Sequence, residues 1–229
     1  MVSARLAAFS DNVMICDTSQ EVLDRSDLVF LAVRPQDAQE VLTPLHFTEG
    51  QHLCSLIASV THETLQDWIG TPVRLFRSIP LPSVAQHRGV TILFPHDPVG
   101  DMLFRPLGTV VSARTVEEFD ALASASAMMG TYFGVLEAAS DWMQSSGIGQ
   151  GDARSYLSGV FAGLAQTAVE NPGKSFDVLR SEHSTPAGLN AEVFEVFSEA
   201  GGTDALKAGL DSVMQRLTTA REAVVEPET

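Results

Sequence analysis

The chain of 229 residues is poor in cysteine, in lysine and in long apolar runs. Its two cysteines, Cys16 and Cys54, each lie in a short apolar stretch, which favours a reducing cytoplasm over a disulfide-stabilised secreted fold. No apolar run is long enough to span a bilayer, and Met1 to Ser10 lacks the apolar segment of a signal peptide. The net charge of −15 argues against nucleic acid and anionic membranes as partners. These absences predict a cytoplasmic protein that binds neither.

Several signatures of catalytic sites are also missing. The six histidines are scattered and the cysteines are not clustered, so a metal site is not expected. The chain has no Gly-x-Ser-x-Gly elbow and no Walker phosphate loop, which leaves little support for nucleophilic hydrolysis. The residues before Ala32 contain no Gly-x-Gly-x-x-Gly turn, which in dinucleotide-binding domains brings the pyrophosphate to a helix N-terminus.

The most informative stretch that is present runs from Asp27 to Gln36. Leu28 to Val33 is an unbroken apolar run that is typical of a parallel strand buried on both faces. Pro35 suits the first turn of a helix that continues to about Leu42. Because ligands of open α/β sheets bind beyond the carboxyl ends of the strands, Val33-Arg34-Pro35 is predicted to border a site. The alternative is a buried strand with an incidental surface arginine.

The remaining elements before Thr115 alternate between strands and short helices. Thr18 and Glu21 form a capping box for a helix to about Arg25, and Thr61 is predicted to cap a helix to about Ile69. This alternation indicates an α/β fold with a parallel, layered sheet. The other candidates are a helix over Ala4–Phe9 and strands over Val13–Cys16, Gln51–Ala58, Val73–Arg77, Val90–Phe94 and Val110-Val111.

The pattern changes at Thr115, which forms a second capping box with Glu118. Residues 1–115 are therefore predicted to form the α/β domain and residues 116–229 an all-helical domain. The apolar stripe of the last helix, from Leu206 to Val224, is typical of a core or a subunit interface. The predicted helices are 116–128, 131–146, 152–170, 175–182, 186–199, where Thr185-Pro186 begins the helix, and 204–225.

Three further stretches combine turn residues with possible ligand contacts. Arg77 to Pro82 is either a rigid loop at the same edge as Arg34 or a stiff domain connector. The small-residue break from Ser126 to Tyr132 either presents free backbone N–H groups to a carboxylate or is an ordinary helix end. Gly201-Gly202 either allows a ligand close to the backbone or is a plain turn, with Thr203 capping the next helix.

Taken in order from Thr18 to Leu217, these stretches resemble the pyrroline-5-carboxylate reductase family. The strand ending in Ala32-Val33-Arg34-Pro35-Gln36 is similar to the family's strand ending in Ala-Val-Lys-Pro-Gln, and Gly201-Gly202-Thr203 is similar to its Ser-Pro-Gly-Gly-Thr-Thr signature. The other matching segments are Arg77-Ser78-Ile79-Pro80 with the Arg-x-Met-Pro-Asn loop, Gly89-Val90-Thr91 with the Gly-x-Thr that follows, and Tyr132 with Glu137-Ala138 at the start of the first long helix of the dimerisation domain.

This resemblance implies a Rossmann-like domain followed by a helical domain that makes a homodimer, and hydride transfer from NADP or NAD to a cyclic imine or a related small molecule. It also implies that Thr203 hydrogen-bonds the substrate nitrogen. A dimeric homologue that has lost catalysis is the alternative. The implied cofactor-binding residues are Ser19, Ala32, Val33, Arg34, Pro35, Ser55 and Arg77, and the implied substrate-binding residues are Ser126, Met128, Met129, Gly130, Gly201 and Gly202.

The chain departs from the family pattern in ways that bear on substrate and cofactor. Leu81 replaces an asparagine near the nicotinamide, Met128-Met129 replaces small residues, and Glu199-Ala200 replaces Ser-Pro. Pyrroline-5-carboxylate is therefore predicted to be a poor substrate or none. Read against the family, Met1 to Ser10 looks like the end of the domain's second helix, so that roughly one and a half βα units are expected to be missing. This predicts a truncated or mis-started chain, an unpaired edge on the strand Leu28–Val33, and weak or absent NAD(P) binding.

Overall fold

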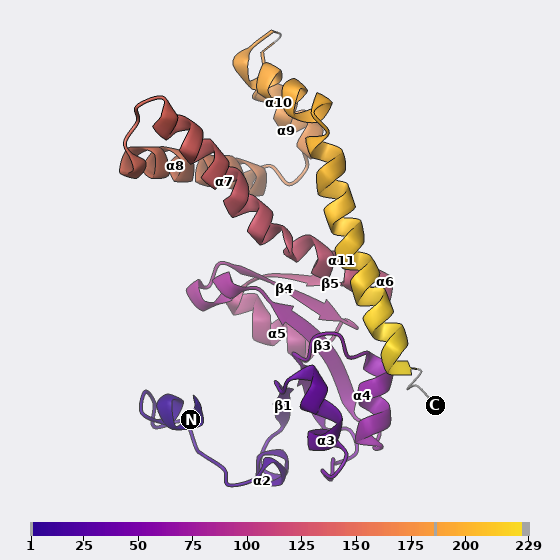
Figure 1. The fold of residues 1–229 in the computed structure, drawn as a ribbon. Coiled ribbons are helices and arrows are strands. Elements are labelled where there is room, and N and C mark those ends of the chain that lie inside the picture. Colours follow the sequence, from indigo (N-terminus) through magenta and orange to yellow (C-terminus); the bar gives the residue numbers. More distant parts are fainter. Residues whose placement is uncertain (1, 186, 226–229) are drawn as a thin grey trace. The chain divides into compact units, whose positions relative to one another are not determined.

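The computed structural model describes residues 2–185 and 187–225, which divide into two compact units. The first unit holds the residues up to Ala123 together with those from Met214 onward, and the second holds Ser124–Val213 (Figure 1). The unit boundary therefore lies inside a helix, and the last turns of the long C-terminal helix group with the first unit. No helix in the described part of the chain combines the length and apolar character needed to cross a membrane.

The first unit is built on a sheet of five strands whose order in space follows the chain. Its strands are β1 (Leu28–Leu31), β2 (His52–Ser55), β3 (Arg74–Pro80), β4 (Gly89–Phe94) and β5 (Gly108–Ser112). The α-helices of this region are α1 (Val2–Ala7), α2 (Ser19–Asp24), α3 (Ala38–Leu42), α4 (His62–Ile69) and α5 (Pro98–Phe104), and the short 3-10 helices are η1 (Pro35–Asp37), η2 (Pro82–Gln86) and η3 (Arg105–Leu107).

One strand pair reverses the direction that the sequence predicted. Strands β1, β2 and β3 are parallel, but β4 is antiparallel to β3, and β5 is then parallel to β4. The link between β3 and β4 contains only η2, whereas a parallel crossover needs about a dozen residues or more. The sheet is dominated by parallel pairs, as expected, and the β3–β4 pair is its antiparallel exception.

The sheet buries apolar side chains on both of its faces. Leu53 and Leu75 pack with residues of α3 and α4 in one cluster, whereas Cys54 and Phe76 pack with Phe104 of α5 in another (Figure 1). Successive residues of a strand point to opposite faces, so each of the two central parallel strands contributes to both clusters. This arrangement is the doubly covered sheet that the apolar runs predicted.

Two predictions for the start of the chain are corrected. Val13–Cys16 is not a strand but an irregular segment, because none of its backbone groups joins a ladder, and a strand needs a partner to be stable. The strand β1 is not buried on both faces: Val29 and Leu31 are buried on one face, whereas the Phe30 side chain on the other face is 44% exposed. Within the described residues β1 pairs only with β2, so its outer edge is unpaired, as predicted.

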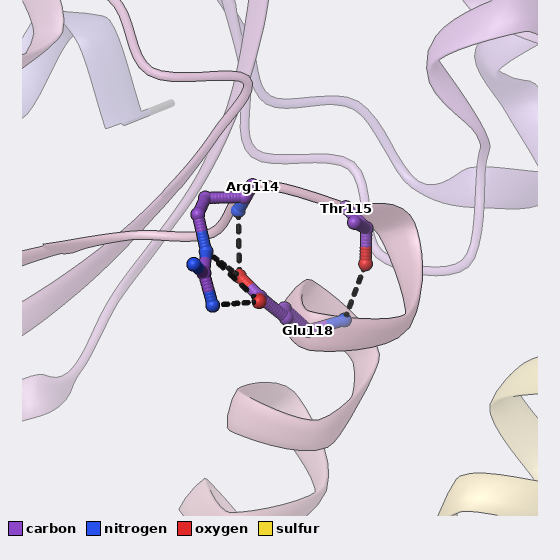
Figure 2. Close-up of polar contacts among 3 residues, drawn as sticks. All are labelled: Arg114, Thr115 and Glu118. Atoms are coloured by element: carbon purple, nitrogen blue, oxygen red, sulfur yellow. Dashed lines mark hydrogen bonds and ion pairs between the residues drawn. The ribbon is translucent and has the colours of Figure 1, made fainter.

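Three of the predicted N-caps, Thr18, Thr61 and Thr115, are confirmed in atomic detail. Thr18 accepts a hydrogen bond from the Glu21 backbone N–H, and Thr61 accepts one from that of Thr64. Thr115 accepts one from the Glu118 N–H at 3.2 Å, and the Glu118 carboxylate accepts from the backbone N–H and the guanidinium of Arg114 (Figure 2). Each cap satisfies an N–H group that has no partner inside its own helix, which fixes where the helix begins.

After Thr115 the chain is helical. The helices are α6 (Val116–Ser126), α7 (Met128–Ser145), α8 (Gln150–Glu170), α9 (Phe176–Glu182), α10 (Leu189–Glu199) and α11 (Gly202–Val225). In the second unit, α7 packs along α8, with Tyr132 and Phe161 in an edge-to-face contact (Figure 1). Helix α10 begins three residues later than Thr185-Pro186 predicted, with Gly188 as its N-cap, and Pro186 itself lies outside the described residues.

Candidate active site

At the carboxyl ends of the parallel strands, two of the predicted residues and the neighbour of a third lie in one row. Leu31 of β1 is in register with Ser55 of β2, and Ser55 is in register with Arg77 of β3. The stretch Ala32–Pro35 leaves the sheet directly after Leu31. The register therefore places most of the predicted cofactor residues at the sheet edge where ligands of open α/β sheets bind.

Arg34 is an exposed cation that is held by one neighbour. Its Nε donates a hydrogen bond to the Asp37 carboxylate at 2.7 Å, and Pro35 between them occupies the first position of η1. Ala32 is exposed, whereas Val33 is half-buried against the core. Ser19, the first residue of α2, is exposed as well. These residues present a cation, a hydroxyl and a small apolar side chain to solvent.

Unlike the exposed residues at this site, Ser55 and Arg77 have buried side chains. The Ser55 hydroxyl accepts a hydrogen bond from the backbone N–H of Ile57, and so fixes the turn after β2. The Arg77 side chain is 7% exposed, and its guanidinium carbon lies 4.5 Å from the centroid of the Phe119 ring. Burial lowers the pKa of Arg77, while Asp120 and Glu63 raise it. Arg77 therefore links β3 to α6 beneath the site edge.

One charged pair, Arg221 with Asp120, lies near Arg77, and the sequence did not single it out. The Arg221 guanidinium donates to the Asp120 carboxylate at 3.0 Å, across 101 positions of the chain. Burial raises the pKa of Asp120, against the opposite effect of Arg221 and Arg77. Within the described residues, two buried polar side-chain atoms have no hydrogen-bond partner, the Nε of Arg77 and the Nδ1 of His62. Local sequence carries no signal for either, because their surroundings come from distant segments.

The buried thiol near this edge is not poised as a nucleophile. Cys54 of β2 is fully buried, and its Sγ lies 3.2 Å from the Ser78 Oγ. Burial raises the pKa of the Cys54 thiol to about 11, so the thiol stays protonated at neutral pH. In the described part of the chain, no three His, Cys, Asp or Glu side chains gather closely enough to hold a metal ion.

The break between α6 and α7 is a single residue. Ala127 keeps right-handed helical angles, with φ −68° and ψ −11°, and its N–H donates to the Ser124 carbonyl. The chain thus passes from α6 to α7 without leaving helical geometry. This is the ordinary helix end, the alternative to a break that presents free N–H groups to a carboxylate. Met128, Met129 and Gly130 follow with exposed side chains or backbone.

The two glycines before α11 each have a structural reason. Gly201 has φ +85°, a left-handed conformation that glycine adopts without strain. A side chain at Gly202 would collide with the Phe197 ring, because a Cβ there would lie 2.4 Å from it. Thr203 is the second residue of α11, so the prediction that it caps this helix is wrong. The helix starts earlier because Gly201 already makes the turn.

The comparisons with known proteins agree with this arrangement. Residues 117–220 match the family described as pyrroline-5-carboxylate reductase dimerisation. The chain is 28% identical over 189 residues to the pyrroline-5-carboxylate reductase of Arabidopsis thaliana, covering 78% of this chain and 67% of that relative. The fold matches that of a pyrroline-5-carboxylate reductase from Coxiella burnetii with a TM-score of 0.83 at 20% identity, over 95% of this chain and 85% of that one.

Residues 117–220 thus belong to the family of pyrroline-5-carboxylate reductase dimerisation domains, and the chain is similar to these reductases over most of its length. Its relatives are oxidoreductases that act on a C=N bond. A third similar structure is the Plasmodium falciparum pyrroline carboxylate reductase with NADP bound, with a TM-score of 0.74 at 14% identity over 90% of this chain and 81% of that one. The chain therefore has the Rossmann-like sheet and the helical dimerisation domain that the resemblance implied.

Proposed function

We propose that the chain catalyses NAD(P)-dependent reduction of a cyclic imine. Similarity to pyrroline-5-carboxylate reductases supports the reaction class, and the row from Leu31 through Ser55 to Arg77 supports the location of the cofactor edge. In this proposal Arg77 braces β3, because its stacking on Phe119 holds the middle of the strand against α6. Ser55 keeps the neighbouring turn close to the sheet.

Two exposed donors among the predicted cofactor residues suit a phosphate-bearing nicotinamide cofactor. Arg34 supplies a cation and Ser19 a hydroxyl, and both are accessible. Ala32, Val33 and Pro35 would border the cofactor through small or apolar surface. The cofactor supplies a hydride when bound; the chain's own residues bind it and orient it. That a solved relative binds NADP supports this cofactor class.

The substrate residues lie in the second unit in this proposal. Ser126, Met128, Met129 and Gly130 occupy the junction of α6 and α7, and Gly201, Gly202 and Thr203 occupy the start of α11. The Thr203 hydroxyl is proposed to hydrogen-bond the imine nitrogen and so to hold the C=N bond in position.

Self-association through the second unit completes the proposal. The matched family is one of dimerisation domains, and many large apolar side chains of this unit are exposed. Many exposed apolar side chains on one unit are typical of a subunit interface. Its members include Phe133, Trp142, Val160, Leu164, Val169, Phe176, Leu189, Val193, Val196 and Phe197. A second copy of the chain is the proposed partner.

The experiment that tests the function is a binding and turnover assay on the purified protein. NADPH and NADH binding is measured by calorimetry, and oxidation of the reduced cofactor is followed with 1-pyrroline and pyrroline-5-carboxylate. Imine-dependent oxidation is expected, and it should fall strongly in Thr203→Val if the hydroxyl holds the imine nitrogen. Cofactor binding without turnover of any imine would contradict the proposal and favour a dimeric homologue without catalysis.

A further inference from the structure

We propose that Arg221, in the last turns of α11, is a positioning residue for the cofactor edge of the sheet, and that it acts through Asp120 of α6 and Arg77 of β3. This inference rests on the proposed function and goes beyond it, because it makes the end of the C-terminal helix a determinant of cofactor affinity. All three residues belong to the first unit. Three observations carry it: the ion pair of Arg221, the second guanidinium beside Asp120, and the place of Arg77 in the strand register.

The ion pair between α11 and α6 joins distant positions and is largely enclosed. The Arg221 guanidinium donates to the Asp120 carboxylate at 3.0 Å across 101 positions, and the two side chains are 28% and 10% exposed. The pair of Arg105 with Asp101 on α5 differs in both respects, because its residues lie four positions apart and its arginine side chain is 67% exposed. Solvent and salt screen an enclosed pair less than an exposed one, so the pair of Arg221 fixes the end of α11 to α6.

Asp120 also interacts with a second guanidinium, that of Arg77. Burial raises the pKa of Asp120, and Arg221 and Arg77 both lower it. The preceding residue, Phe119, stacks on the Arg77 guanidinium, whose carbon lies 4.5 Å from the ring centroid. Two successive residues of α6 therefore interact with the Arg77 side chain, one through an aromatic face and one through charge. Because Arg221 pairs with the same carboxylate, its loss changes the balance of charge around Arg77.

The strand register connects Arg77 to the cofactor edge. Arg77 of β3 is in register with Ser55 of β2, and Ser55 is in register with Leu31 of β1, after which Ala32–Pro35 leaves the sheet. Paired residues of neighbouring parallel strands point to the same face, so the Ser55 and Arg77 side chains leave the sheet on one side. The Ser55 hydroxyl fixes the turn after β2 by accepting the N–H of Ile57. A displacement of β3 at Arg77 therefore displaces the residues that are proposed to border the cofactor.

The cost of these charges argues for a role beyond stability. Arg77 and Asp120 are each 7% exposed, and Phe119 beside them belongs to an apolar cluster with Ile92 and Ala113. Buried charges lose their hydration, and apolar side chains of similar volume often stabilise a fold as well or better. What a charged network supplies instead is a single, directed arrangement of the groups that it joins. A binding edge needs such fixed positions, because small displacements of its supporting residues weaken binding.

The test measures the NADPH affinity of the purified full chain and of α11 variants by calorimetry. In Arg221→Gln the Kd for NADPH is expected to rise roughly tenfold, because Asp120 loses one of its two guanidinium partners. Arg221→Lys, which keeps a cation, should recover most of the affinity. Arg216→Gln changes an exposed arginine of the same helix and should leave the Kd unchanged. In turnover of an imine, the KM for NADPH should rise in Arg221→Gln while kcat stays close to that of the parent, because the reacting groups themselves are unaltered.

A double-mutant cycle shows whether Arg221 acts through Asp120. Asp120→Asn keeps the shape of the side chain and removes the charge that interacts with both guanidinium groups, so the Kd should rise by roughly tenfold or more. Adding Arg221→Gln to Asp120→Asn should then raise the Kd little further, because the interaction is already lost. Fold-changes that multiply, as those of independent residues do, would overturn this route from α11 to the sheet.

The outcomes separate this inference from the proposed function. Unfolding temperatures are measured by circular dichroism for each variant, because a pair that only stabilises the fold would lower the unfolding temperature of Arg221→Gln and leave the Kd of the folded protein unchanged. That result would overturn the inference and leave the proposed function in place. Should Arg221→Gln not fold, Asp120→Asn decides in the same way, since an unchanged Kd there would also overturn the inference. A parent chain that binds neither NADPH nor NADH would overturn both.

Discussion

The guanidinium of Arg77 stacks on the ring of Phe119, with its central carbon 4.5 Å from the ring centroid. The two residues come from β3 and α6, and both side chains are buried. The guanidinium thus provides a flat, weakly hydrated surface to the aromatic face, and the nearby Asp120 carboxylate favours its charge. This contact ties the sheet edge of the candidate site to the first helix after the sheet.

Replacing Arg77 by lysine should therefore destabilise the protein more than replacing it by methionine. Lysine keeps a buried charge but cannot stack flat, so the free energy of unfolding should fall by about 1–2 kcal/mol. Methionine also loses the stacking, but it removes the cost of burying a charge and leaves Asp120 paired with Arg221, so its loss should be smaller. Urea unfolding of both variants measures the difference. The exposed Arg88→Lys is the control, and a larger loss in Arg77→Met would contradict this reading.

His62 should make stability depend on pH below its ordinary pKa of 6.5. Burial is the main cause that lowers the pKa of His62; Glu63 acts in the opposite direction and Arg77 lowers it further. The neutral imidazole is thus favoured in the folded state. The contribution of His62 to the free energy of unfolding is complete above pH 6.5 and is lost as the pH falls below this value, because the unfolded chain binds the proton more tightly.

The variant His62→Gln removes this titration. Its free energy of unfolding should change less than that of the parent chain between pH 7 and pH 5, while His87→Gln, at an exposed position, should follow the parent. Glu63, Asp120 and Arg221 keep their charges in both variants, so the difference isolates His62. Equal pH dependence in His62→Gln and the parent would show that this imidazole does not titrate as inferred.

The sequence revealed those parts of the fold that depend on near neighbours. The caps at Thr18, Thr61 and Thr115 were predictable because each side chain bonds a backbone group three residues later. The change to an all-helical pattern near Thr115 was visible for the same reason. The glycine requirement at Gly201 is also local, because it follows from a positive φ at the end of α10.

The missed features depend on distant partners. The strand prediction for Val13–Cys16 rested on apolar propensity, which forms no strand without a ladder partner. The reversal at β4 depends on a connection too short for a parallel crossover, and Asp120 finds Arg221 from the far end of the chain. In the candidate site, the sequence indicated the exposed edge at Arg34 but not the burial of Arg77 on Phe119, 42 positions later in the chain.

Releasing Arg34 from its ion pair should strengthen binding of the cofactor. The Nε of Arg34 donates to Asp37 at 2.7 Å, so a bound phosphate has to compete with this carboxylate. An exposed pair of this kind contributes about 0.2–1 kcal/mol, which corresponds to a gain in NADPH affinity of up to about fivefold in Asp37→Asn at low salt. Calorimetric titration with NADPH measures this. The matched control is Asp101→Asn, which breaks the comparable pair with Arg105 on α5 and should leave affinity unchanged. Weaker binding in Asp37→Asn would place Arg34 outside the cofactor site.

The exposed face of α10 should be part of the interface between two copies. Leu189, Val193 and Val196 lie on one side of this helix, at positions i, i+4 and i+7, and the Val193 side chain is 71% exposed. Val193→Glu places a charge on this face in both copies of a symmetric dimer. Because each copy loses the burial of one apolar side chain, the dimer should weaken by about 3 kcal/mol or more, roughly a hundredfold in Kd.

Sedimentation equilibrium of the parent chain and of two variants tests this interface. Val193→Glu is expected to shift the protein to monomer at micromolar concentration, whereas Met102→Glu, at a methionine of α5 that is 69% exposed, should leave the dimer intact. Because each copy carries a net charge of −15, dimerisation should also strengthen as salt screens the repulsion between copies. A parent chain that is monomeric at every salt concentration would refute self-association. A Val193→Glu variant that dimerises as tightly as the parent would exclude this face of α10 from the interface.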